Sequence, residues 1–154
     1  MELAIGRPVG AAPVLKLKGD ASNRSYYRVG TAPDSWVLMV MPPDSLKKSE
    51  EASKGPAPTE LPFINVHRYL SKLGVRVPKI LRFDEPAGMM VLEDLTDLTF
   101  EAALKQGSRE ELYQRAVRLL ACLRADAEGR PDPTCLAFTR AFDARFRIRR
   151  MVPV

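Results

Sequence analysis

The sequence is poor in the residues on which most metal and nucleophilic chemistry depends. Its 154 residues include one histidine (His67), two cysteines (Cys122 and Cys135) and two asparagines (Asn23 and Asn65). A zinc site would need carboxylates for most of its ligands, which is unusual, and two widely spaced cysteines form neither a CxxC motif nor a disulfide framework. No serine stands in a nucleophile elbow, so a hydrolytic triad is not expected.

Long apolar segments are also missing. No uninterrupted run approaches the ~18 residues that a membrane span needs, and the first residues lack the basic-then-apolar layout of a secretory signal. We therefore expect a cytoplasmic protein without a membrane partner. A content of 45% hydrophobic and 28% charged residues is that of one globular domain of ordinary size.

The net charge of +5 is unevenly placed. Residues 140–154 contain five arginines and one acid, Asp143, so this segment alone carries +4. Basic character confined to one end does not predict a nucleic-acid partner. Phe138, Phe142 and Phe146 recur every four residues and predict an amphipathic helix. Its arginine face is expected to be solvated; the alternatives are a membrane surface, a nucleic acid or an acidic partner.

Short apolar runs between turn residues predict strands in the first part of the sequence. These runs are residues 14–17, 26–29, 36–41 and 88–92, with a further extended segment at 75–83. Residues 44–58 lack apolar spacing and are expected to form a loop. The methionines at 39, 41, 89 and 90 are expected to fill the core of the sheet.

One helix is expected between the third strand and the extended segment. Phe63, Val66, Leu70 and Leu73 follow at spacings of three and four, which is one face of a helix. Thr59 is its expected N-cap, Pro62 lies in its first turn and Gly74 ends it. A sheet with this single helix on one face satisfies the order of elements.

After about residue 93 the pattern is helical. A short helix from the N-cap Thr99 to Leu104 precedes a capping box of Ser108 and Glu111. Leu112, Ala116, Leu119 and Leu123 then mark the face of a longer helix that breaks at 129–133. Such apolar faces need a partner surface that this part can hardly supply, so it looks cut short. We expect self-association through exposed apolar helix faces.

Two segments are candidates for chemistry. The turn between the first two strands can form an anion-binding nest from Gly19, Asp20, Ala21 and Ser22, with Arg24 as an added donor; the alternative is an ordinary hairpin turn. Glu93 and Asp94 follow the apolar end of a strand, where main-chain groups can bind a flat heterocycle; the alternative is that the two acids cap the following turn.

In this order the segments resemble bacterial sugar kinases related to the aminoglycoside phosphotransferases, and most closely the N-acetylmuramate/N-acetylglucosamine anomeric kinases of cell-wall recycling. Residues 19–29 look like their nucleotide-loop hairpin and 37–43 like their third strand. Residues 63–81 are similar to the helix and following strand, and 91–97 to the hinge between lobes. The resemblance runs from about residue 14 to 149.

The resemblance implies an α+β, protein-kinase-like fold and ATP as cofactor. Residues 1–92 would form a nucleotide-binding N-lobe of an antiparallel sheet plus one helix, 93–97 the hinge, and 98–154 the first helices of a truncated helical C-lobe. Gly19, Asp20, Ala21, Ser22 and Arg24 would cover the phosphates, while Glu93, Asp94 and Leu95 would hold the base. Glu60 stands where relatives carry a glutamate that pairs with a strand lysine, and that lysine position is occupied by Met39.

The catalytic loop of the resembled kinases has no match. Phosphoryl transfer in kinase-like folds uses a His-x-Asp-x-x-x-x-Asn loop and a later Asp, but His67-Arg68-Tyr69 has no acid at its third place. No residue is nominated as base or metal ligand, and Mg²⁺ is expected only with a complete catalytic lobe. We expect the nucleotide-binding part of a sugar kinase, with nucleotide and sugar as small-molecule partners; the alternative is a non-catalytic pseudokinase fragment or a binding module with a basic tail.

Overall fold

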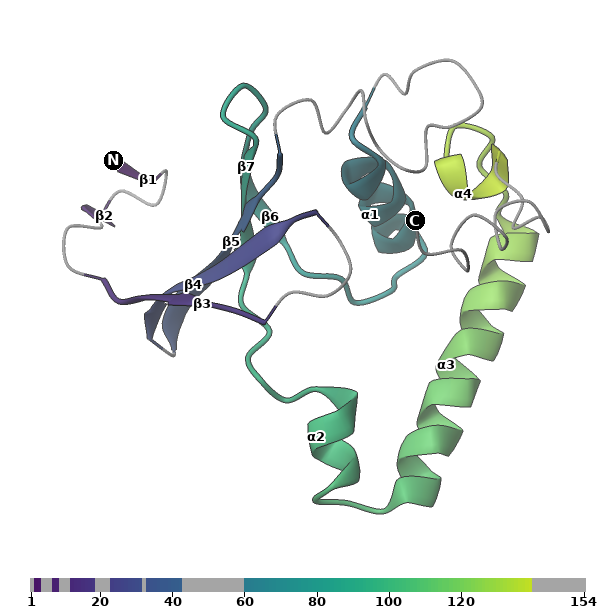
Figure 1. Ribbon diagram of the computed structural model, residues 1–154. Coiled ribbons are helices and arrows are strands. Elements are labelled where there is room, and N and C mark those ends of the chain that lie inside the picture. Colours follow the sequence, from purple (N-terminus) through teal and green to yellow (C-terminus); the bar gives the residue numbers. More distant parts are fainter. Residues whose placement is uncertain are drawn as a thin grey trace, which may run out of the picture. The chain divides into compact units, whose positions relative to one another are not determined.

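A computed structural model describes residues 2–3, 7–8, 12–18, 23–31, 33–42 and 60–139 (Figure 1). The chain divides into two compact units. The first comprises Met1–Pro58 and Val77–Tyr113, and the second comprises Thr59–Arg76 and Gln114–Val154. The expected lobe boundaries at residues 92 and 98 remain a prediction.

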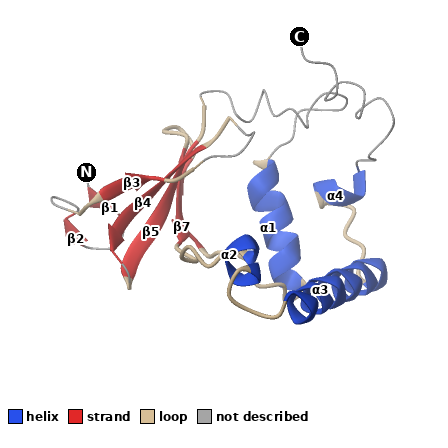
Figure 2. Cartoon of the chain, turned by 60° about the horizontal axis from the view of Figure 1, so that its bottom comes forward, coloured by secondary structure: helices blue, strands red, loops and turns tan. Residues whose placement is uncertain are grey.

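The first unit contains an antiparallel sheet of five strands in the order β3-β4-β5-β7-β6 (Figure 2, red). The four expected strands and the extended segment are confirmed. A separate ladder joins two short strands that the sequence analysis did not predict, β1 (Glu2–Leu3) and β2 (Arg7–Pro8). The sheet strands are β3 (Val14–Lys16), β4 (Ser25–Thr31), β5 (Asp34–Val40), β6 (Ile80–Asp84) and β7 (Met89–Glu93).

Turn chemistry explains where the hairpins form. Gly30 has a φ of +93° at the β4–β5 hairpin, a conformation that glycine adopts without steric cost. At the β6–β7 turn, the main-chain N–H of Ala87 donates to Asp84 Oδ1 at 3.0 Å, and Gly88 has a φ of +62°. Asp and Gly are the residues such turns favour.

The centre of the sheet is filled by methionine, as the sequence predicts. Met39 and Met90 are register partners on β5 and β7, and both side chains are fully buried. Met41, Val91 and Leu92 are also buried. Because the unbranched thioether fits irregular gaps, methionine suits the interior of a short twisted sheet.

The two capped helices after the sheet form as predicted. α2 (Phe100–Leu104) begins at the N-cap Thr99, whose Oγ1 accepts the N–H of Ala102 at 3.1 Å. α3 spans Arg109–Gly129, and its start is preceded by Ser108. α3 carries exposed apolar side chains on more than one side, because Val117, Leu119 and Leu120 are each about 60% exposed or more.

The second unit is built on α1 (Pro62–Lys72) and α4 (Leu136–Thr139), which pack together with the last turns of α3. Its apolar cluster consists of three buried residues, Tyr69, Leu73 and Cys135, with Val66, Val75, Leu123 and Ala127 packed against them. These contacts define the packing of α1 within its own unit. Its expected place on a face of the sheet stays a prediction.

Two details of α1 differ from expectation. The N-cap is Leu61, without a side-chain cap, so Thr59 as N-cap was wrong; Pro62 at the first helical position has no N–H to satisfy and starts the helix there. The most buried face runs through Asn65 and Tyr69 rather than through Phe63 and Leu70, because both of the former bind the segment at 130–136. The expected loop at 44–58 and the helix beyond residue 139 lie outside the described residues.

Candidate functional site

The connector is the segment of residues 93–97, which starts with the last residue of β7 and leaves the sheet at the end where β5 begins. Glu93 is the last residue of β7 and pairs with Trp36 of β5. Arg28, Val37 and Leu92 are register partners across β4, β5 and β7, so their side chains share one face of the sheet.

Arg28 ties the connector to β4 through two carboxylates. Its Nε and Nη2 donate to Asp94 Oδ2 and Oδ1 at 2.6 and 3.1 Å. Its Nη1 and Nη2 donate to Asp97 Oδ2 and Oδ1 at 2.7 and 3.0 Å. The side chains of Arg28 and Asp94 are only 15% and 5% exposed, whereas that of Asp97 is 80% exposed. The pair with Asp94 is therefore the shielded half of the cluster.

Asp94 also organises its own turn. Its Oδ2 accepts the hydroxyl of Ser35 at 2.7 Å, and its Oδ1 accepts the main-chain N–H of Thr96 at 2.8 Å. Thr96 has a φ of +66°, which is unusual for a β-branched residue and costs of order 1–3 kcal/mol. The bonds to Asp94 hold the main chain in that conformation.

These contacts shift the ionisation of the cluster. Hydrogen bonds from Arg28, with smaller contributions from Ser35 and Thr96, lower the pKa of Asp94 to about 2. Arg28 likewise lowers the pKa of Asp97. The pKa of Arg28 is raised, mainly by its hydrogen bonds to Asp97 and Asp94. All three groups are therefore charged at neutral pH. The Asp94 side chain caps the turn, which is the alternative that the sequence analysis gave for this acid.

The other two connector residues nominated from the sequence, Glu93 and Leu95, differ in their hydrogen bonding. Glu93 accepts the main-chain N–H of Lys79 at 3.0 Å through Oε2, and its own N–H donates to the Lys79 carbonyl at 2.9 Å. Leu95 is half-exposed. Within the described ranges, no hydrogen bond engages the main chain of Leu95. Its N–H and C=O are thus among the main-chain groups of the connector that are open to a planar ligand.

Two further nominees of the first unit, Arg24 and Met39, lie further along the sheet. Arg24 precedes β4 and is half-buried, at the end of the strand pair where Ser25 meets Val40. Met39 is fully buried in the sheet, so no ammonium group occupies the lysine position. Gly19, Asp20, Ala21 and Ser22 lie outside the described residues.

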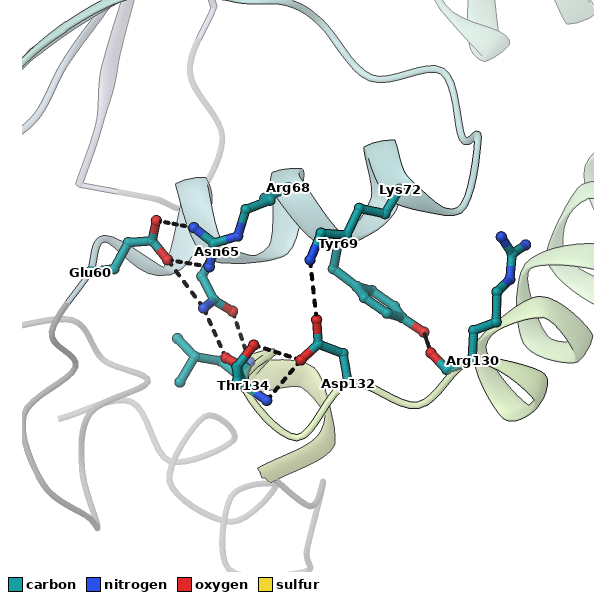
Figure 3. Close-up of polar contacts among 9 residues, drawn as sticks. Glu60, Asn65, Arg68, Tyr69, Lys72, Arg130, Asp132 and Thr134 are labelled. Carbon is teal, nitrogen blue, oxygen red and sulfur yellow. Dashed lines mark hydrogen bonds and ion pairs between the residues drawn. The ribbon is translucent and has the colours of Figure 1, made fainter.

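Glu60 belongs to the second unit, where its partners come from α1 (Figure 3). Arg68 donates to both of its carboxylate oxygens, at 2.5 and 2.8 Å, and Asn65 Nδ2 donates to Oε2 at 3.3 Å. The hydrogen bonds from Arg68 lower the pKa of Glu60. In this structure the carboxylate of Glu60 is paired with Arg68.

A buried asparagine joins α1 to the loop before α4, as Figure 3 shows in part. Asn65 Nδ2 donates to the Thr134 carbonyl at 3.0 Å, and Oδ1 accepts the N–H of Leu136 at 2.8 Å. On the next turn of α1, the hydroxyl of Tyr69 donates to the Arg130 carbonyl at 3.0 Å. Every polar atom of the Asn65 side chain is satisfied, so this cluster is a structural tie.

The described residues offer neither a metal cluster nor a membrane-spanning helix. They contain no group of three or more His, Cys, Asp and Glu side chains placed to hold a metal ion. In the same part of the chain, no helix combines the length and the apolar character that crossing a membrane requires.

Sequence reasoning missed Arg28 as a member of the site. A signal for it exists: Arg28 is the one charged residue within a strand of seven, and two acids spaced three apart, Asp94 and Asp97, follow a distant apolar strand. Local pattern could show that these charges need partners. It could not show that they are each other's partners.

Comparison with known proteins now defines the class. Residues 14–152 match the model of the phosphotransferase enzyme family, so the chain belongs to that family. An N-acetylmuramate/N-acetylglucosamine kinase of Pseudomonas aeruginosa is 32% identical over 132 residues, which cover 83% of this chain and 36% of that kinase. A kinase with the same name from Caulobacter vibrioides is 30% identical over 138 residues, covering 79% of this chain and 37% of that kinase.

The chain therefore spans a little over a third of the length of the curated relatives it matches. No solved structure matches it significantly. The five-stranded antiparallel sheet with following helices agrees with the α+β fold that the resemblance implied.

Proposed function

We propose that the chain is the nucleotide-binding part of an ATP-dependent sugar kinase, with the connector as the seat of the base. The observation that carries the proposal is the state of the connector: its carboxylates are engaged by Arg28, Ser35 and Thr96, while the main chain of Leu95 is open and half-exposed. An exposed N–H and C=O beside an apolar side chain suit the edge and face of a purine.

The sheet register supports a second contact region for the phosphates. Trp36, next to the connector, and Val40, next to the start of β4, lie four residues apart on β5. That separation is about 13 Å along a strand, a distance that a nucleoside triphosphate spans. We propose that residues 19–24, at the far end, cover the phosphates, where glycine and consecutive N–H groups suit an anion.

The substrate and location follow from the same proposal. Both relatives are named for N-acetylmuramate and N-acetylglucosamine, so we propose an amino sugar hydroxyl as the acceptor in the complete protein and a role in cell-wall recycling. A kinase that uses ATP works where ATP is abundant, which favours the cytoplasm. Mg²⁺ would neutralise the transferred phosphates, and we propose that its ligands come from a complete catalytic lobe.

Titration of the isotopically labelled chain by NMR tests the nucleotide site. Adenosine should shift the amide signals of residues 93–98, tripolyphosphate those of residues 19–24, and ATP both sets. The variant Leu95→Ala keeps the main-chain N–H but loses the apolar side chain beside it, so it should shift the same signals with weaker affinity. Unmoved connector signals at millimolar adenosine would refute base binding at this position.

Turnover is tested separately. A coupled assay with ATP, Mg²⁺ and N-acetylmuramate should give no phosphoryl transfer by this chain alone, because no residue matches the family's catalytic loop. Clear turnover would show that the catalytic groups lie within these 154 residues and would overturn that part of the proposal.

A further inference from the structure

Arg28 is the contact that joins β4 to the connector across 66 and 69 residues of sequence. It directs all of its described hydrogen bonds to Asp94 and Asp97, which lie on either side of Leu95 and Thr96. The guanidinium thus spans the two ends of the turn that carries the open main chain. A single side chain limits the movement of both ends.

The chemistry of the contact requires an arginine. The planar guanidinium presents several N–H donors in a fixed fork, so it binds two carboxylates at once. A lysine at the same place is a point charge on a flexible stem, and it would bind one carboxylate or share itself loosely between the two. Replacing Arg28 by lysine would therefore keep the positive charge but lose the geometry that holds the turn.

We propose that Arg28 is a positioning residue for the nucleotide base: it holds residues 94–97 in the conformation that presents the Leu95 main chain, and it sets base affinity without touching the nucleotide. This inference rests on the proposed function. A ligand that binds only the ordered turn loses apparent affinity in proportion to the fraction of molecules that have the turn ordered. Arg28 therefore acts by preorganisation, which lowers the entropic cost of binding.

We expect unequal effects from weakening the two ion pairs of Arg28, one with Asp94 and one with Asp97. Asp94 is shielded and also fixes Thr96, whereas Asp97 is largely exposed. Exposed ion pairs contribute little, so Asp97→Asn should weaken adenosine binding about twofold to threefold. Arg28→Lys, which loosens both ion pairs, should weaken it about tenfold, as expected if the turn is ordered about a tenth of the time.

The experiment measures adenosine affinity by NMR titration for the unaltered chain, Arg28→Lys, Asp97→Asn and a control. Arg82→Lys is the matched control, because it makes the same exchange at an exposed position on β6 of the same sheet. Adenosine is uncharged, so a change in affinity does not report a general charge effect. Amide hydrogen exchange at Thr96 and the thermal midpoint are recorded for each variant.

The expected result is weaker adenosine binding and faster exchange at Thr96, whose N–H is bonded to Asp94, in Arg28→Lys, with the control unchanged. Equal adenosine affinity in Arg28→Lys and the unaltered chain overturns the inference, whatever happens to the thermal midpoint. If the unaltered chain binds no adenosine, the proposed function fails, and the role of Arg28 in affinity fails with it. Should Arg28→Lys not fold, Asp97→Asn against the control decides the question in the same way.

Discussion

The ion pair of Arg28 and Asp94 predicts a pH-dependent part of the stability of the sheet. The perturbation is Asp94→Asn, which removes the carboxylate charge and keeps the size of the side chain. Asp94 accepts hydrogen bonds from Arg28, Ser35 and Thr96, and its side chain is only 5% exposed. Solvent screening is therefore weak at this carboxylate, and the loss should be measurable.

The magnitude follows from the pKa of Asp94. Folding lowers this pKa from 3.8 to about 2, a difference worth about 2 kcal/mol at neutral pH. A carboxylate with a lowered pKa stabilises the folded state above its unfolded pKa, and that stabilisation is lost as pH falls towards the folded pKa. The advantage of the unaltered chain over D94N should thus shrink by about 1 kcal/mol between about pH 7 and pH 3.

The assay is urea unfolding followed by the fluorescence of Trp36, the single tryptophan. Trp36 lies on β5 and pairs with Glu93 beside the connector, so it reports on the sheet. Glu85→Gln, at an exposed position in the β6–β7 turn, is the control and should leave stability unchanged at every pH. A gap between the unaltered chain and D94N that stays constant with pH would refute the reasoning.

Three further changes have expected outcomes. Asn65→Ala leaves the Leu136 N–H and the Thr134 carbonyl without their partner and should cost about 2 kcal/mol, measured by urea unfolding with far-ultraviolet circular dichroism; a loss near zero would mean that water replaces the amide. Gly30→Ala places a Cβ against the Asp34 carbonyl at a φ of +93° and should lower stability by about 2 kcal/mol. Gly129→Ala, with nothing near its Cβ, is its neutral control. Leu120→Glu, at an exposed apolar position of α3, tests the self-association that the sequence predicts: it should weaken association about tenfold by sedimentation, since a buried leucine contributes roughly 1.5–3 kcal/mol, and unchanged association would exclude Leu120 from the contact.

The sequence alone was enough to locate the five strands of the main sheet and the helices at 62–72, 100–104 and 109–129. Those positions depend on local signals: Thr99 caps its helix, Gly74 and Gly88 adopt positive φ, and apolar residues recur at the spacing of each element. Each signal acts within a few residues, so one sequence suffices to read it. The connector could also be located from a local signal, because two acids directly after an apolar strand mark the end of that strand.

Only the tertiary structure decided which distant side chains meet. Arg28 reaches the connector because the register of β4, β5 and β7 places it on the same face as Leu92, two residues before Asp94, and register is set by the whole sheet. Asn65 is buried because the chain returns from α3 to offer it the main chain of residues 134–136. A polar residue in a sequence shows a need for partners, whereas the fold supplies them. For that reason the burial of Asn65 and Tyr69 on α1 and the anchor of the connector were not foreseen, whereas Val66 and Leu73 were.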